Sequence, residues 1–253
     1  MNAALNDLLD TVAKHHDVAT MAAKSMPLMV NYLGADNGSL LLLSQERVVH
    51  RVLATKETFT QVSEHKVRTV ITEGLAGWVL QRRQGGLASD TAMDDRWVSM
   101  GDTTIGSALV VPMLSRNTVV GLLSFHHGQR GFLRERHLAS AAELAQVLAP
   151  LFDVALMAES SLAALSDLCL CASHPSTVLD WQGDVKVVNK AMEQLDIIWN
   201  PGQFAQSLLP RELGVDTVAQ CDWEGMRKLA TLPFAANAVQ FPGVGVWIQL
   251  ASR

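Results

Sequence analysis

The sequence predicts an α+β protein: an antiparallel sheet flanked by helices, then a long connecting helix, then a second, smaller α+β domain. Three patterns predict this class. Apolar residues at helical spacing fill the segment before "LGADNG", short apolar runs divided by turn residues follow from Ser39, and a helical pattern continues from about Arg134. The 253 residues suffice for two modest domains, since about 100 to 200 residues per domain is usual.

The N-terminal half predicts alternating helices and short strands. Two helices are separated by "KHHD", with Asp17 as N-cap of the second, and "LGADNG" ends that helix. "SLLLLS" and "RVVHRVLA" predict a hairpin, and "HKVRTVITEG" is a candidate for another strand. "LAGWVLQRR" predicts a helix, "GLASD" a small strand, and "TAMDDRWVSMGDTT" a loop with room for one helical turn.

The two strongest strand patterns are "IGSALVVPML" and "TVVGLLSFHH", joined by "SRN". Both are apolar on both faces, which predicts central strands. Pro112 lies inside the first of them and lacks a backbone N–H. We therefore expect a bulge or a sheet edge at that position.

From about Arg134 a long helix is predicted, and Pro150 should kink or split it near its middle. Its apolar residues alternate in steps of three and four, which fits an amphipathic helix packed on its own domain or an interdomain and dimer helix. They are Leu138, Ala141, Ala145, Leu148, Phe152, Ala155, Leu162 and Cys169. After "SHPS", "TVLDWQGDVKVVNKAMEQL" predicts two strands and a helix start, and "AVQFPGVGVWIQLAS" predicts two closing strands.

Composition narrows the function classes. Hydrophobic residues make up 49% and charged residues 18%, and the net charge of -5 comes without a basic run, so a nucleic-acid surface is not expected. No apolar run reaches about 18 residues, and acidic residues near the N-terminus do not fit a signal peptide. Three cysteines, Cys169, Cys171 and Cys221, are too few for a disulfide framework. We expect a cytoplasmic protein with no membrane span.

The stretch "EGLAGWVLQ" has two glycines, Gly74 and Gly77, at a predicted helix start. A phosphate-binding loop would add a Lys and a Ser or Thr, or a third glycine with a later acidic residue, and neither is present. The favoured interpretation is structural, with the glycines allowing a tight helix entry and close packing on the sheet.

The order of these patterns resembles the GAF domain family over residues 1–155. The specific part is "GLAGWV" followed by Asp90 and then the strands with Pro112 and Gly121. Residues 175–253, with Gly183 in a turn and Asn189 before a helix, look like a PAS domain. A long helix over residues 134–172 overlaps the end of the first domain and connects the two. The resemblance implies sensory modules that bind a small ligand, or only transmit, and act on an effector through their terminal helices.

Some activities of the resembling family are not expected here. The positions that mark cyclic-nucleotide binding read His126, His127, Phe132, Arg136 and His137, of which only the phenylalanine fits. Members that reduce methionine sulfoxide or attach bilins need cysteines within the domain, and residues 1–155 contain none.

The resemblance places the ligand pocket beside the loop with Asp90, Asp94, Asp95 and Asp102, although capping and turn formation explain most such aspartates. A carboxylate, a guanidinium and an indole close together suit a small-ligand site. The candidate ligand-binding residues, with Trp97 the first choice, are Trp97, Arg96, Asp94, Asp95, Thr103, Thr104, Ser107 and His126.

Metal and catalytic sites are not predicted. His126 and His127 are adjacent in a strand and point to opposite faces, so they cannot chelate one ion together, and a haem or metal role for His126 alone competes with an ordinary strand-end histidine. Cys169, Cys171 and His174 resemble part of a metal site but lack a clear fourth ligand, and buried apolar cysteines are favoured. No catalytic motif stands out, so the chain is not expected to be an enzyme, and the sequence leaves any cofactor unknown.

Three functions compete. The favoured one is a cytoplasmic sensory or regulatory protein that binds a small molecule, forms a homodimer through the long helix and acts on a partner or on an effector domain outside this sequence. The second is an interaction scaffold whose cavity is filled by its own side chains. The third, an enzyme using the loop from Asp90 to Asp102, is the least favoured.

Overall fold

The computed structural model describes residues 3–15, 17–44, 47–55, 59–60, 72, 74–98, 105–180, 185–194, 234–241 and 245–252. The chain divides into two compact units, Met1–Leu156 and Met157–Arg253. The candidate strand in "HKVRTVITEG" lies outside the described residues except for Thr72 and Gly74.

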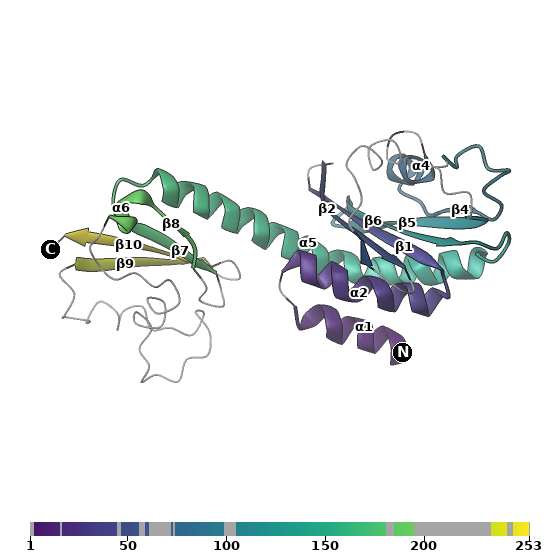
Figure 1. Cartoon of the computed structure of the whole chain (residues 1–253), viewed down its shortest axis with the longest axis horizontal. Helices are drawn as coiled ribbons and strands as arrows, with labels where there is room; N and C mark the ends of the chain where they lie inside the picture. The colour runs from purple at the N-terminus through teal and green to yellow at the C-terminus, as the bar shows by residue number, and fades with distance from the viewer. Residues whose placement is uncertain are drawn as a thin grey trace. The chain divides into compact units, whose positions relative to one another are not determined.

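The first unit is built on a six-stranded antiparallel sheet with the order β3-β2-β1-β6-β5-β4. Figure 1 shows α1, α2 and the first half of α5 on one side of this sheet and α4 on the other. The strands are β1 (Asn37–Ser44), β2 (Arg47–Thr55), β3 (Phe59–Thr60), β4 (Gly86–Ala88), β5 (Ser107–Ser115) and β6 (Thr118–His127). The helices are α1 (Ala3–Ala13), α2 (Val18–Leu33), α4 (Leu75–Arg82) and α5 (Glu135–Cys171).

The predicted caps of α2 are present. The Asp17 carboxylate accepts a hydrogen bond from the Thr20 backbone N–H at 2.7 Å, so it satisfies a donor that the helix leaves free. Gly34 ends the helix in the left-handed region with φ 64°, where glycine avoids the steric cost of a Cβ. The same helix continues through Pro27.

Strands β5 and β6 lie in the interior of the sheet, as the sequence predicts. β4 pairs only with Ala108–Val110, so Pro112 lies beyond its end and faces β6 alone. The missing N–H of Pro112 therefore breaks no ladder bond to β4, and the register shifts one residue later, between Met113 and Leu114. Pro112 therefore lies at a local edge of the sheet, and the bulge follows it by one residue.

Helix α5 runs unbroken through Pro150, so the predicted split does not occur. Up to Leu156 its buried residues join the core of the first unit, where they meet α1, α2 and the sheet; they are Ala141, Leu144, Ala145, Leu148, Ala149, Phe152 and Leu156. The sequence pattern in this half of the helix thus serves packing within its own unit.

Helix α5 is also long and apolar enough to cross a membrane, judged by length and composition alone. The expectation concerned unbroken apolar runs, and polar residues interrupt the apolar residues of α5. Core helices of soluble proteins pass it too.

The second unit contains a four-stranded antiparallel sheet with the order β8-β7-β10-β9. Its elements are β7 (Ser176–Asp180), β8 (Val185–Val188), α6 (Lys190–Glu193), β9 (Phe234–Phe241) and β10 (Gly245–Ser252). Leu165 and Cys169 of α5 pack on Val178, with Trp247 against them. Asn189 caps α6 by accepting from the Met192 N–H at 2.9 Å.

Candidate functional site

The α4 side of the sheet carries a small apolar core. Leu75, Ala76 and Val79 of α4 pack on strand residues, and Trp78 and Trp97 lie partly buried at its margin; the strand residues are Leu41, Ala88, Val110 and Leu122. Gly74, with extended backbone, begins the helix and has no side chain to cap it. Gly77 is among the buried residues of α4, and the structural interpretation of the two glycines stays a prediction.

The loop after β4 is folded by its own aspartates. Asp90 accepts a hydrogen bond from the Ala92 N–H at 3.0 Å, and Asp94 accepts one from the Arg96 N–H at 3.0 Å. Both are side-chain turns in which the carboxylate bonds the backbone two residues later. The prediction that turn formation explains these aspartates holds for this pair.

Asp94 also holds the Arg96 side chain. Arg96 Nε donates to Asp94 Oδ1 at 2.9 Å and Nη2 donates to Oδ2 at 2.7 Å, a two-pronged ion pair, while Nη2 also donates to the Leu87 carbonyl at 2.9 Å. The guanidinium carbon lies 4.8 Å from the centroid of the Trp78 ring, in cation–π contact. This pairing ties the loop to both β4 and α4.

The ion pair shifts the ionisation of both partners. Hydrogen bonding by the Arg96 side chain holds the pKa of the Asp94 carboxyl below its ordinary value, against the opposing effect of burial. The same bond raises the pKa of the Arg96 guanidinium. Both groups are therefore charged at neutral pH.

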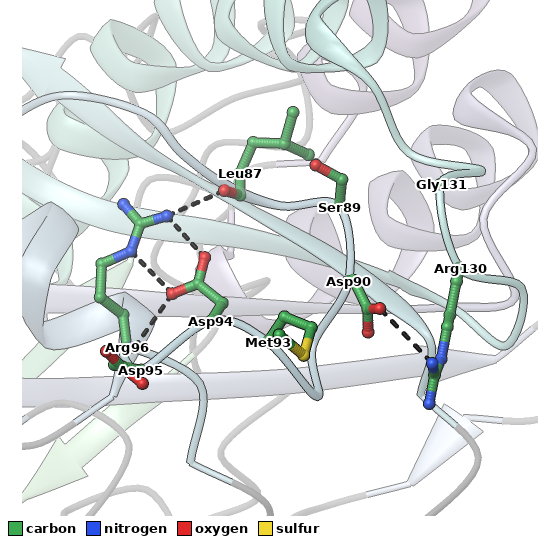
Figure 2. A pocket seen from close by; sticks show the side chains of 9 residues that line it. All are labelled: Leu87, Ser89, Asp90, Met93, Asp94, Asp95, Arg96, Arg130 and Gly131. Carbon is green, nitrogen blue, oxygen red and sulfur yellow. Dashed lines mark hydrogen bonds and ion pairs between the residues drawn. The ribbon is translucent and has the colours of Figure 1, made fainter.

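An open depression of about 730 Å³ lies along this loop. Figure 2 shows the Asp94–Arg96 pair on one side of it, Met93 in the middle and the Asp90–Arg130 pair, 3.5 Å apart, on the other. The lining residues are Leu87, Ser89, Asp90, Met93, Asp94, Asp95, Arg96, Arg130 and Gly131. The depression offers both signs of charge around an exposed thioether.

Two more of the predicted residues meet beside this loop. The rings of Trp97 and His126 have centroids 5.4 Å apart and are nearly perpendicular, an edge-to-face contact. Phe125 and His127 flank His126 in β6 and point to the other face, where Phe125 is buried in the main core and His127 stacks on Phe132 at 3.6 Å. The two histidines thus face opposite ways, as their adjacency in a strand predicts.

The structure separates Ser107 from this group. Its Oγ donates to the Gln129 carbonyl at 2.8 Å and accepts from the Leu133 N–H at 3.3 Å, on the side of the sheet that α5 covers. Strand alternation puts Ser107 and Leu109 on one face and Ala108 on the other, so this hydroxyl secures the entry to α5 instead. Thr103, Thr104 and Asp102 lie outside the described residues.

Sequence reasoning missed the residues that approach from outside the loop. Arg130 and Gly131 come from the turn between β6 and α5, and the Gly131 N–H donates to the Ser89 carbonyl at 2.7 Å. The glycine-containing polar stretch "HHGQRG" signals such a turn. Its closeness to β4 follows only from the pairing of β4 and β6 with β5.

Within the described parts of the chain, no group of three or more His, Cys, Asp or Glu residues could hold a metal ion. Cys169 is buried and Cys171 exposed. Burial raises the pKa of the Cys169 thiol, as expected of an apolar core cysteine. Cys221 lies outside the described residues.

The ion pair at the loop gives a pH-dependent prediction. Asp94→Asn should destabilise the first unit by about 1 to 2 kcal/mol at pH 7, because it removes a charge-assisted bond to an arginine that is a third exposed. The folded-state pKa of Asp94 is depressed, so its contribution is complete above 3.8 and disappears as the pH falls through the folded value.

Urea unfolding of both proteins at a series of pH values measures this difference. The exposed Asp95→Asn variant is the control and should stay within about 0.5 kcal/mol of the parent. A gap between Asp94→Asn and the parent that does not shrink as the pH falls below 3.8 would contradict the assignment.

Comparison with solved structures places this fold among known ones. The chain is similar to the free methionine-R-sulfoxide reductase of Neisseria meningitidis, with 16% identity and a TM-score of 0.51, over 61% of this chain and 89% of that one. It is also similar to the GAF domain of a phosphoenolpyruvate-protein phosphotransferase from Coxiella burnetii, with 18% identity and a TM-score of 0.50, over 62% of this chain and 95% of that one. No curated protein matches the chain.

The first of these similarities corrects one prediction. The sequence was expected to encode a protein that is not an enzyme, yet the Neisseria protein with this fold is a reductase. The fold that the chain adopts is therefore shared by enzymes.

The family model for the GAF domain matches residues 15–153, more than half of the chain. The matched segment contains α2, the hairpin, α4, the central strands and the first half of α5. By this match, together with the sheet and helices described above, the chain belongs to the GAF domain family.

Proposed function

We propose that this chain is a sensory or regulatory protein whose GAF domain binds a small ligand at the depression along the 87–96 loop. Membership of the GAF family indicates a ligand-binding or regulatory role. The observation that carries the proposal is the convergence of Asp94, Arg96 and Trp78, with Trp97 and His126 in contact close by. Charged groups of both signs line the open hollow, and such a lining suits a small polar or zwitterionic molecule.

The transmission part of the proposal concerns the long helix and the second unit. We assign residues 134–172 to the connecting helix and residues 175–253 to a PAS-like domain. An antiparallel sheet and the Asn189-capped helix after its second strand support that assignment. The output would be a partner protein, or an effector domain outside this sequence.

We further propose a cytoplasmic homodimer formed through α5. Support for the dimer comes from exposed apolar side chains on this helix, among them Val154, Met157 and Leu168. Light scattering of the full chain measures the mass directly, and a strict monomer at high micromolar concentration removes the dimer from the proposal.

Ligand binding is tested on the full chain. Native mass spectrometry of protein purified from its own host reports any retained small molecule, and thermal unfolding against a panel of amino acids, nucleotides and organic acids reports stabilisation. A ligand at 100 times its dissociation constant should add about 2.7 kcal/mol to the stability of the unit that binds it.

The site is tested with the double variant Asp95→Ala and Arg130→Ala. Both side chains are exposed and line the depression, so the variant should fold with a stability within about 1 kcal/mol of the parent. It should lose most of the ligand-induced stabilisation. Glu143→Ala, an exposed change on α5, is the control and should keep it. A ligand that stabilises the parent and the double variant equally binds elsewhere.

One observation favours the scaffold as second candidate. The α4 face of the sheet is closed by the chain's own side chains, since Leu75, Val79 and Leu122 are all buried there. If no compound stabilises the protein and none is retained from the host, the scaffold replaces the sensor.

A further inference from the structure

We infer that the two-residue turn between β5 and β6 couples the candidate ligand site to helix α5, so that a rearrangement at Asp94 and Arg96 alters how α5 is held. The regulatory meaning of this coupling rests on the proposed function. The contacts on which the inference is based do not depend on that function. They join the 87–96 loop, α4, the β5–β6 turn and α5 in one continuous series.

The first link joins the site to α4. Arg96 is fixed from the loop side by Asp94 and by the Leu87 carbonyl, and its guanidinium lies over the Trp78 ring, 4.8 Å from the centroid. Helix α4 has only eight residues, and its buried side chains pack on the sheet. A change in the Arg96 position therefore acts on the whole helix rather than on one turn of it.

The second link joins α4 to the turn. Arg83 follows the helix in the left-handed region, with φ 55°, and its N–H donates to the Val79 carbonyl at 2.7 Å. From there Nη1 of Arg83 donates to the Asn117 carbonyl at 3.2 Å. The backbone of Arg83 is fixed as the cap of α4. If the end of the helix moves, the Arg83 side chain and its hydrogen bond to the Asn117 carbonyl are therefore displaced with it.

The turn itself is stiff. Arg116 and Asn117 have φ values of 48° and 63°, and Ser115 pairs directly with Thr118. Positive φ at both central residues is the tight hairpin geometry whose twist matches that of the strands. A displacement of the Asn117 carbonyl therefore also displaces Arg116, the other central residue of this turn.

The third link joins the turn to α5. The Ser115 hydroxyl donates to Asp153 Oδ2 at 2.7 Å, and Arg116 donates to the same oxygen from Nε at 3.0 Å and Nη2 at 2.7 Å. Asp153 is only 14% exposed, and it follows the fully buried Phe152. Three donors on one carboxylate oxygen fix α5 three residues before the end of the first unit at Leu156.

The position of the 115–117 turn explains how these contacts connect the ligand side of the sheet to α5. Helices α4 and α5 cover opposite faces of the sheet (Figure 1), and the 115–117 turn contacts both of them at the end of two central strands. The 128–131 segment, which lines the depression, leads into the start of α5, whereas the 115–117 turn joins α4 to Asp153, further along α5. A change at Asp94 and Arg96 therefore reaches the middle of α5 by way of this turn.

Hydrogen exchange of the full chain tests the coupling by mutation, without a ligand. Arg96→Ala releases Trp78 and should speed amide exchange in residues 147–156 of α5 about threefold or more, within the range of measured coupling energies. In the Arg83→Ala background, where the second link is broken, Arg96→Ala should add nothing there. Arg82→Ala, the exposed neighbour of Arg83, is the matched control and should leave the Arg96→Ala effect intact.

A second experiment avoids the Arg83→Ala variant, because that substitution could destabilise the whole sheet and so obscure the result. Asp153→Asn breaks the far end, and because coupling is mutual it should speed exchange in α4, residues 75–82, about threefold while the β6 core at Leu122–Phe125 stays protected. Additive effects of Arg96→Ala and Arg83→Ala, or unchanged α4 exchange in Asp153→Asn, overturn the inference. If a ligand binds but the exchange experiments show no coupling, the inference fails and the proposed function stands. If the exchange experiments show coupling but no ligand binds, the inference stands and the proposed function fails.

Discussion

Replacing Phe152 by alanine is expected to destabilise the first unit by about 3 to 5 kcal/mol. The side chain is fully buried in a core that α1, α2, α5 and the sheet share. Its removal leaves a cavity in the core to which these helices and the sheet contribute, and a close-packed core cannot fill such a cavity completely. Domains of this size are stable by only about 5 to 15 kcal/mol, so the loss is a large part of the total.

The neighbouring residue provides the control. Leu151 is 36% exposed, and Leu151→Ala should cost less than about 1 kcal/mol because less apolar area leaves water there on folding. Urea unfolding of the full chain gives both free energies, and hydrogen exchange in β6 identifies the transition that belongs to the first unit. Equal costs for the two variants would mean that α5 does not present this face to the sheet.

Replacing Gly106 by alanine is expected to cost about 2 to 3 kcal/mol and to abolish ligand stabilisation at the depression. An added Cβ would overlap the Gly128 carbonyl oxygen and would lie 2.6 Å from the Arg130 backbone nitrogen. These are backbone atoms of the 128–131 segment and cannot rotate away. That segment must shift, and it carries Arg130 and Gly131 into the lining of the depression.

Gly85 is the matched control for this change. A Cβ at Gly85 would meet the ends of flexible side chains, Leu138 Cδ1 at 3.0 Å and Val111 Cγ1 at 3.3 Å, which can adjust by a few tenths of an ångström. Gly85→Ala should therefore keep ligand stabilisation, measured as the shift in unfolding temperature on addition of the compound. If Gly106→Ala retains the full shift, the 128–131 segment does not form part of the site.

The secondary structure followed from local chemistry wherever that chemistry was strong. Asp17 and Gly34 bound α2 because a side-chain acceptor and a left-handed glycine act within a few residues. At Pro150 one of the two expected outcomes is excluded, because α5 continues through this residue and is not split there. The buried residues on either side of Pro150, Ala149 and Phe152, hold the helix against the core, and tertiary packing outweighs the local cost.

The candidate site divides in the same way. Asp94, Arg96 and Trp97 are neighbours in sequence, so their grouping was visible from the chain alone. Ser107 was assigned to the same site because it begins the next strand, and strand alternation turned it to the opposite face. Arg130 was missed because its approach to Asp90 spans 40 positions along the chain.

By itself, the sequence determined the GAF fold, the order of its helices and strands, the turns at Asp90 and Asp94, and the opposed directions of His126 and His127. These follow from spacing, alternation and capping, which act over a few residues. Only the tertiary structure decided that Arg96 lies over Trp78, that Arg130 lines the depression and that the 115–117 turn joins α4 to α5. Strand pairing sets those contacts, and it joins residues whose separation along the chain carries no local signal.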